Sequence, residues 1–466
     1  MDLDALDLSL IRATIARALA RGGDFAEVFV EDRDGLNLRL EDRRLEHVNG
    51  GREQGAGVRL LSGEHTYYAY TDEVDEAALT AAADAVSAAL RAAGAPGTLV
   101  DLGPVRRDSG GHPVVVAPDQ VDVALKAALV HAADDEARAT GAEIAQVIAG
   151  YADSRQDVLI VNSLGEVVRD TRTRTRLSVQ VVARREDVIQ TGHETAGASS
   201  GFELLDDATV LDVARRAAGK ALAMLDARPA PVGTMPVVLA NGFGGTLFHE
   251  ACGHGLEADA VAKEASIYAG KVGHRVAASI VNAYDDGRLP NGWGSQAFDD
   301  EGVPTQKTRV IEDGRLTGYL YDRLRARQLG ATPSGNGRRQ SFRHVPIPRM
   351  TTTYIAPGDA TPEEIVAATR RGFYAKSLAG GQVEPASGNF VFGVAEGYLI
   401  EDGRITAPLR GATLVGSGID VLEKIDMVAG DFEVKSGICG KDGQGVPVGT
   451  GQATLRISSM TVGGTG

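Results

Sequence analysis

The sequence contains few cysteines and few aromatic residues. Two cysteines occur in 466 residues, which excludes a framework of several disulfides. The fold must therefore be stabilised by buried apolar side chains. Hydrophobic residues make up 43% of the chain, which is enough for a substantial core at this length. Aromatic residues make up only 5%, with Trp293 the single tryptophan, which argues against stacking platforms of the kind that bind carbohydrates.

The chain also lacks excess positive charge and long apolar runs. Its 48 basic and 63 acidic side chains give a net charge of −15, which excludes a binder of the nucleic-acid backbone. No apolar run approaches the roughly 20 residues that cross a bilayer, and the first ten residues are acidic where a signal peptide is positive. We expect a cytoplasmic protein with no nucleic-acid and no membrane partner.

The first half of the sequence predicts helices mixed with antiparallel strands. Apolar residues at helical spacing over 7–20 predict a helix, and the alternating pattern that follows predicts a hairpin with a turn at Asp34-Gly35. Further patterns predict two strands over 55–72, alanine-rich helices with acidic starts over 72–93 and 119–140, strands over 143–187 with a turn at 163–165, and a helix over 208–227.

The second half predicts a strand, a glycine-rich turn, one helix and then many short strands. The strand covers 236–240 and the helix begins near Thr246. Short strands without long intervening helices favour antiparallel sheet. The predicted fold class is therefore α+β with two domains: an N-terminal mixed helix and antiparallel-sheet domain over 1–228, and a C-terminal, largely antiparallel β domain over 232–466 that carries the metal-site helix. The proline-containing stretch between them predicts a linker.

One motif is too specific to be expected by chance from the composition, and it is the strongest candidate for a functional site: His249-Glu250-x-x-x-His254. From the composition, a histidine, an acid and a second histidine at this spacing are expected by chance about 0.02 times. The common zinc-protease pattern has one residue fewer, so that both imidazoles share a helical face. Five residues advance a regular helix by about 500°, which leaves the imidazoles about 140° apart. The motif therefore predicts a π-bulge or a helix end near Gly253 and Gly255.

Two imidazoles are too few for a catalytic zinc, which normally has three protein ligands and an open position. The nearby candidates for the third ligand are Glu257 and Asp259. His274 lies further along, and Cys439 lies far downstream in a glycine-rich segment predicted to be a loop. These residues alone leave the choice open. Cys252, inside the motif, is expected to pack in the core.

Residues 249–259, HEACGHGLEAD, resemble the TldD and PmbA zinc metalloprotease family, specifically its TldD-type subunit, whose signature is HExxxH. The resemblance extends over nearly the whole chain. It is carried by five further segments: residues 298–304, 348–350, 387–390, 396–399 and 437–444.

The resemblance implies one zinc ion per subunit, with His249, His254 and Cys439 as ligands. It places Glu250 where the family has its catalytic glutamate, which would take a proton from metal-bound water and return it to the leaving amine. It implies a peptidase that hydrolyses short or unfolded peptides. It further implies a dimer that encloses the site through the N-terminal domain, either a homodimer or a heterodimer with a PmbA/TldE-like subunit. Because this chain carries the motif, it would be the active subunit.

The alternative function is a non-catalytic peptide-binding or scaffold subunit with a structural zinc, which would not need Glu250. Two other charged segments stand out. Asp299, Asp300 and Glu301 are candidates for binding substrate, through a second cation or a basic peptide, although three acids in a loop are commonly just solvated. Residues 338–339 and 343–344 form a small basic patch that could receive a peptide carboxylate.

Overall fold

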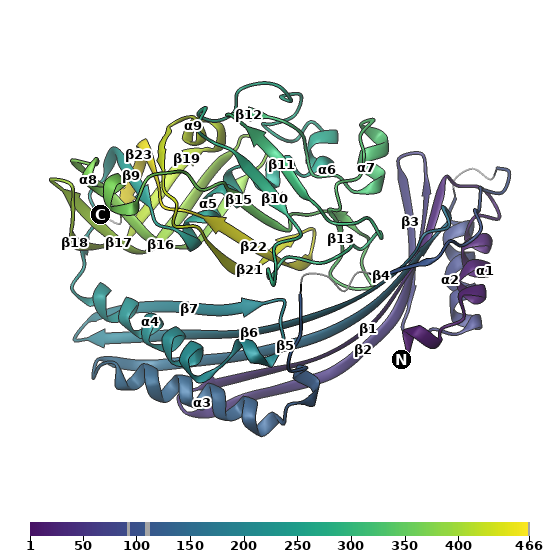
Figure 1. Cartoon of the computed structure of the whole chain (residues 1–466), viewed down its shortest axis with the longest axis horizontal. Helices are drawn as coiled ribbons and strands as arrows, with labels where there is room; N and C mark the ends of the chain where they lie inside the picture. Colours follow the sequence, from purple (N-terminus) through teal and green to yellow (C-terminus); the bar gives the residue numbers. More distant parts are fainter. Residues whose placement is uncertain (91–93, 108–111, 465–466) are drawn as a thin grey trace.

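The computed structural model describes residues 1–90, 94–107 and 112–464. The last residues of the helix predicted over 72–93 lie outside this part. A long, curved sheet from the first half of the chain lies under the second half (Figure 1). Its strand order is β3-β2-β1-β5-β6-β4, and β7 also pairs with β6. Its strands are β1 Phe25–Glu41, β2 Arg44–Ser62, β3 His65–Thr71, β4 Val105–Arg107, β5 Ile144–Asn162, β6 Val167–Arg185 and β7 Val188–Ala198.

Four helices cover one face of this sheet in two pairs. They are α1 Leu8–Ala18, α2 Glu76–Ala88, α3 Val123–Ala139 and α4 Asp207–Leu225. Each begins after an aspartate whose carboxylate accepts a backbone N–H of the first turn, the arrangement that the acidic starts predict. Val28 and Leu38 of β1 point to this face, where they pack with the first and the second helix pair respectively. Phe29 points the other way, toward the second half of the chain.

The prediction of a turn at Asp34-Gly35 is wrong. Both residues lie inside β1, and the chain reverses instead at Asp42 and Arg43, which have φ of 46° and 67°. A Cβ on Gly35 would lie 2.9 Å from the carbonyl oxygen of Asp153 on β5. Glycine is therefore needed here for close approach of two strands, a role that a sequence cannot distinguish from a turn.

The second half of the chain folds into two larger sheets and a small one. The eight-stranded sheet has the order β16-β9-β23-β19-β17-β18-β8, with β20 paired to β23; the six-stranded sheet has the order β12-β11-β10-β15-β22-β21; β13 pairs with β14. The strands are β8 Arg228–Pro229, β9 Gly233–Leu239, β10 Ala283–Asp286, β11 Lys307–Glu312, β12 Arg315–Leu316, β13 Gly337–Arg338, β14 Ile347–Pro348, β15 Thr352–Ile355, β16 Arg371–Glu384, β17 Asn389–Glu401, β18 Arg404–Arg410, β19 Ala412–Ser417, β20 Ile425–Val428, β21 Glu433–Lys441, β22 Gln444–Gln452 and β23 Leu455–Gly464.

The helices of this half are short: α5 Gly245–Ala251, α6 Ala258–Ala262, α7 Arg323–Gln328, α8 Pro362–Ala367 and α9 Gly418–Glu423. Most strand pairs are antiparallel, so the α+β class with largely antiparallel sheet is confirmed. α5 lies between the two larger sheets and contacts β15 and β22 on one side and β16 and β17 on the other. Its side chains Leu247 and Phe248 are buried in the main core.

The segment predicted as a linker is in part a strand. β8 pairs in parallel with β18 and so joins the eight-stranded sheet. We keep the division into 1–228 and 232–466 as a proposal. Across the described residues, no helix combines the length and apolar character needed to span a bilayer.

Candidate metal centre

The HExxxH motif begins on α5, which is held tightly against the six-stranded sheet. A Cβ on Gly245 would lie 2.8 Å from the carbonyl oxygen of Gly451 on β22. Only glycine therefore allows the start of the helix to approach the strand so closely. This approach carries His249, which is 3% exposed, into the space between the helix and the sheet.

The helix ends inside the motif, as its spacing predicts. α5 stops at Ala251, Cys252 adopts φ −128° and ψ −53°, and a 3₁₀ turn follows over Gly253–Leu256. This break takes up the additional residue and turns the second imidazole back toward the first. The rings of His249 and His254 lie with centroids 5.1 Å apart and planes at 84°.

Cys439 joins the two histidines from β21, a strand and not the predicted loop. Its Sγ lies 3.3 Å from Nε2 of His249 and 3.3 Å from Nε2 of His254. Tetrahedral zinc, with bonds of about 2.0–2.1 Å to nitrogen and about 2.3 Å to sulfur, places such atoms about 3.6 Å apart. All three donor atoms lie within 4.8 Å of one another. Two imidazoles and a thiolate at this spacing fit a zinc ion and leave a fourth position for another ligand.

Neighbouring side chains orient both imidazoles. Nδ1 of His249 lies 3.2 Å from Oγ1 of Thr353, and Nδ1 of His254 lies 3.0 Å from Oε2 of Glu257. Lys441 donates to that same carboxylate at 3.0 Å. In each ring the second nitrogen is engaged, so Nε2 is presented to the centre, as metal-binding histidines require.

The charges at this centre favour a thiolate. Burial alone would raise the pKa of Cys439, but hydrogen bonds and charge from His249 and His254 outweigh it and lower the pKa to about 5. Burial would lower the pKa of His254, yet Glu257 and Cys439 raise it to about 11. Burial opposes ionisation of Glu257, while Lys441 and His254 lower its pKa to about 2. The thiolate is the form that binds a metal.

Glu250 stands beside the donors and is not one of the convergent set. Its Oε2 lies 3.7 Å from Nε2 of His254, and its side chain is 21% exposed. Burial raises its pKa, and the two histidines offset this only in part. A partly exposed carboxylate of raised pKa beside the donors suits a group that accepts and later returns a proton.

The other residues considered as the third ligand lie outside the group formed by His249, His254 and Cys439. Glu257 and Asp259 are not part of the convergent group: Glu257 contacts the other ring nitrogen of His254, and both acids form ion pairs with Lys441. His274 is exposed and stands outside the donor group. Cys252 is fully buried in the core, as expected, and burial raises its pKa to about 12.

The acidic loop is neither solvated nor open to ligands, which corrects that expectation. Asp299, Asp300 and Glu301 are at most 2% exposed. Asp300 pairs with Arg172 of β6 at 2.5 Å, and Glu301 pairs with Arg59 of β2. Asp300 and Glu301 thus join the second half of the chain to the curved sheet, while Asp299 accepts backbone N–H groups of its own half. All three carboxylates are already occupied by partners within the protein.

The basic patch is largely internal as well. Arg338 and Arg339 are buried, and Arg339 pairs with Glu27 at 2.5 Å. Arg343 alone reaches the surface, where it pairs with Asp72 at 2.8 Å. Sequence reasoning missed the buried partners because they lie hundreds of residues away. It also missed Thr353 and Lys441. Lys441 lies in the GKDG segment directly after Cys439, which was the one signal available in the sequence, and nothing pointed to Thr353.

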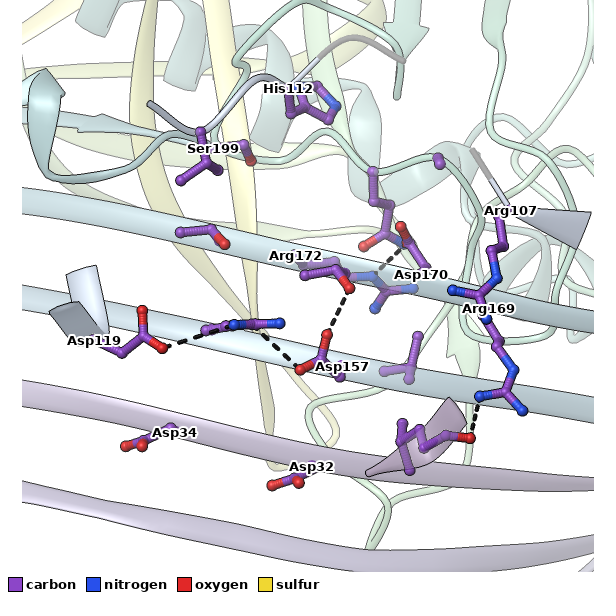
Figure 2. Close-up of a pocket in the computed structure, with 18 of the residues that line it drawn as sticks. Asp32, Asp34, Arg107, His112, Asp119, Asp157, Arg169, Asp170, Arg172 and Ser199 are labelled. Carbon is purple, nitrogen blue, oxygen red and sulfur yellow. Dashed lines mark hydrogen bonds and ion pairs between the residues drawn. The ribbon is translucent and has the colours of Figure 1, made fainter. Parts of the chain in front are cut away.

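A hollow of about 760 Å³ lies elsewhere, over strands of the curved sheet (Figure 2). None of the convergent donors lines it. Its charged groups largely satisfy one another; Arg155, for example, lies 3.3 Å from Asp157 and 3.7 Å from Asp119. The candidate metal centre is therefore indicated by its donor geometry and not by the size of a cavity.

Three family models together match most of the chain. They are the PmbA/TldA metallopeptidase domain 1 over residues 26–93, the central domain over 117–225 and the C-terminal domain over 232–464. A "Metalloprotease TldD homolog" of Haemophilus influenzae is 39% identical over 96% of this chain and 94% of that protein. A "Zinc metalloprotease TldD homolog" of Saccharolobus solfataricus is 33% identical over 64% of this chain and 67% of that protein.

Among solved structures, TldE of Thermococcus kodakarensis superposes with a TM-score of 0.79, at 19% identity, over 98% of this chain and 99% of that one. At that identity the likeness shows a shared fold.

Proposed function

The chain belongs to the PmbA/TldD metallopeptidase family, and from this we propose that it is a zinc-dependent peptidase that hydrolyses short or unfolded peptides. The single observation that carries the proposal is the convergence of His249, His254 and Cys439, with Glu250 beside the group. The zinc named for the Saccharolobus relative supports the choice of metal. One ion per subunit is part of the proposal, supported by the one such group found among the described residues.

In the proposed reaction, different residues of the site would bind the metal, orient its ligands and transfer the proton. When bound, zinc supplies a Lewis acid that polarises the scissile carbonyl and acidifies a water molecule. His249, His254 and Cys439 would hold the ion, with Thr353 and Glu257 fixing the rings. Glu250 would accept a proton on its carboxylate as the nucleophile forms and return it to the departing amine.

The partner and the cellular location remain part of the proposal. We propose a cytoplasmic dimer, formed with a second copy or with a TldE-like subunit. The similarity in fold to a protein named TldE supports the second option. In either assembly the domain over 1–228 would take part in dimerisation and in enclosing the substrate.

Substituting Glu250→Gln tests the mechanism against the alternative of a scaffold with a structural zinc. The amide keeps the shape of the side chain but cannot accept a proton at neutral pH. We expect the variant to retain zinc, measured by elemental analysis, and to lose peptide cleavage by about 100-fold or more. Unchanged turnover would refute the role of Glu250. Activity that survives exhaustive chelation would refute a metallopeptidase altogether.

A further inference from the structure

Two arginines of β6 face the second half of the chain, and neither has a carboxylate partner among the residues that the structure describes. Arg172, Arg174 and Arg176 alternate along the strand and so share one face. Arg172 pairs with Asp170 and Asp300. Arg174 is 6% exposed, yet within the described residues its guanidinium donates only from Nε, to the carbonyl oxygen of Trp293 at 3.1 Å. Burying a guanidinium without an anion is costly, so an unpaired one needs an explanation.

Arg176 shares this property. Its Nε is buried and has no hydrogen-bond partner in the part of the chain that the structure describes. Burial lowers the pKa of its guanidinium. Two adjacent positions of one strand face thus carry guanidinium groups whose donors are not all satisfied by the described residues.

Both arginines are linked to β21, the strand that carries Cys439, through residues that they contact. Nε1 of Trp293, whose carbonyl binds Arg174, donates to the carbonyl oxygen of Gly437 at 2.9 Å. A Cβ on Gly197 of β7 would lie 2.7 Å from Oγ of Ser436 and 3.2 Å from Cγ of Arg176. Ser436 also has a buried oxygen without a hydrogen-bond partner. Cys439 follows two residues after Gly437, which is about 7 Å along a strand.

A third guanidinium adds positive charge on the far side of the same hairpin. Arg338 is 2% exposed and donates to the carbonyl oxygen of Pro447 at 2.7 Å, and Pro447 pairs with Ile438 next to Cys439. No described carboxylate forms an ion pair with Arg338. Burial, and then the charge of neighbouring arginines that include Arg338, lowers the pKa of Arg174 to about 9. The surroundings of Arg174 are therefore short of negative charge.

We propose that Arg174 and Arg176 form a subsite for a carboxylate of the peptide substrate, beside the strand that carries Cys439. The inference rests on the proposed peptidase function. The planar fork of a guanidinium matches a carboxylate through two parallel hydrogen bonds. The whole chain has a net charge of −15, but these clustered arginines make the local charge positive. An acidic group of a substrate is therefore attracted here. The carboxylate can come from the C-terminus of the peptide or from an aspartate or glutamate side chain.

Binding measured without turnover tests the subsite. A mixture of ten-residue peptides is made with a free C-terminal carboxylate and again as the C-terminal amide, each with a fluorescent label at the N-terminus. Fluorescence anisotropy then gives their affinity for the zinc-loaded Glu250→Gln protein. We expect the free acids to bind about tenfold more tightly than the amides, and Arg174→Met to bring this ratio to about one.

A second pair of peptides, with an internal glutamate or glutamine and an amide end, identifies the source of the carboxylate. A preference for glutamate assigns the subsite to side chains, and a preference for the free acid alone assigns it to the C-terminus. Equal affinity for all four peptides would overturn the proposal. If the subsite preference is present but the wild-type protein cleaves no peptide, only the peptidase proposal fails.

Thermal unfolding separates a binding role from a structural one, with Arg172→Met as the matched control on the same face. Arg172→Met leaves Asp170 and Asp300 buried without their cation, so it should melt at a lower temperature than the wild type. Arg174→Met removes an uncompensated charge and should melt at the wild-type temperature or above. A drop for Arg174→Met as large as that for Arg172→Met would show a structural arginine and overturn the proposal.

Discussion

The two cysteines of the metal-free protein should differ sharply in reactivity. Both are buried, but the pKa of Cys439 is lowered to about 5 and that of Cys252 is raised to about 12. At pH 7, Cys439 is then about 99% thiolate, and Cys252 is thiolate in about one molecule in 10⁵. A thiolate of lower pKa is intrinsically less nucleophilic. Over seven pKa units this makes the Cys439 thiolate about 10³·⁵-fold slower to react than the Cys252 thiolate. The remaining factor, about 30-fold, favours alkylation of Cys439.

Alkylation by iodoacetamide, followed by mass spectrometry of the digested protein, measures both sites in one sample. Because the pKa of Cys439 is lowered, its labelling should persist as the pH falls and should decline only through about pH 5. Added zinc should protect Cys439, and Cys439→Ser should leave a protein that is hardly labelled at pH 7. A labelling midpoint near 8.5, or equal labelling of both cysteines, would refute the inferred histidine–thiolate arrangement.

Two further substitutions test the supports of the site and of the fold. Thr353→Val removes the hydrogen-bonding partner of His249 Nδ1 and leaves the shape of the side chain nearly unchanged. Zinc affinity, measured against a competing chelator, should therefore fall about 10- to 100-fold. An unchanged affinity would contradict the role of Thr353 in orienting the ring. Arg59→Met leaves Glu301 buried without its cation, while Glu27 keeps its ion pair with Arg339, so the free energy of unfolding should fall by about 3–5 kcal/mol. Urea denaturation measures this loss, and an unchanged midpoint would show that the ion pairs contribute nothing to stability.

Local patterns in the sequence predicted most elements correctly. Aspartates mark the helix starts at Asp7, Asp75, Asp122 and Asp206, because a capping carboxylate satisfies backbone N–H groups within its own turn. The turn at 163–165 was also predicted correctly. Asp34-Gly35 was predicted incorrectly because glycine serves both turns and close strand contacts, and the contact with Asp153 is remote in sequence.

Charged residues were the least predictable from the sequence. Asp299, Asp300 and Glu301 look like a solvated loop, and Arg338 and Arg339 look like a surface patch. In the structure all of them are buried, and Asp300, Glu301 and Arg339 form ion pairs with the first half of the chain. Whether a charge is solvated or paired depends on partners such as Arg59 and Arg172, which belong to other strands and to which no local spacing points.

The sequence by itself determined that the chain carries two imidazoles and a glutamate in one motif, and that the helix holding them has to break. That follows from helical geometry alone, since five residues cannot bring two side chains to one face. Only the tertiary structure decided which third donor completes the group. Cys439 reaches the histidines because β21 pairs with β22, and α5 packs on β22 through Gly245. Such convergence depends on packing between segments nearly two hundred residues apart, which short-range patterns do not encode.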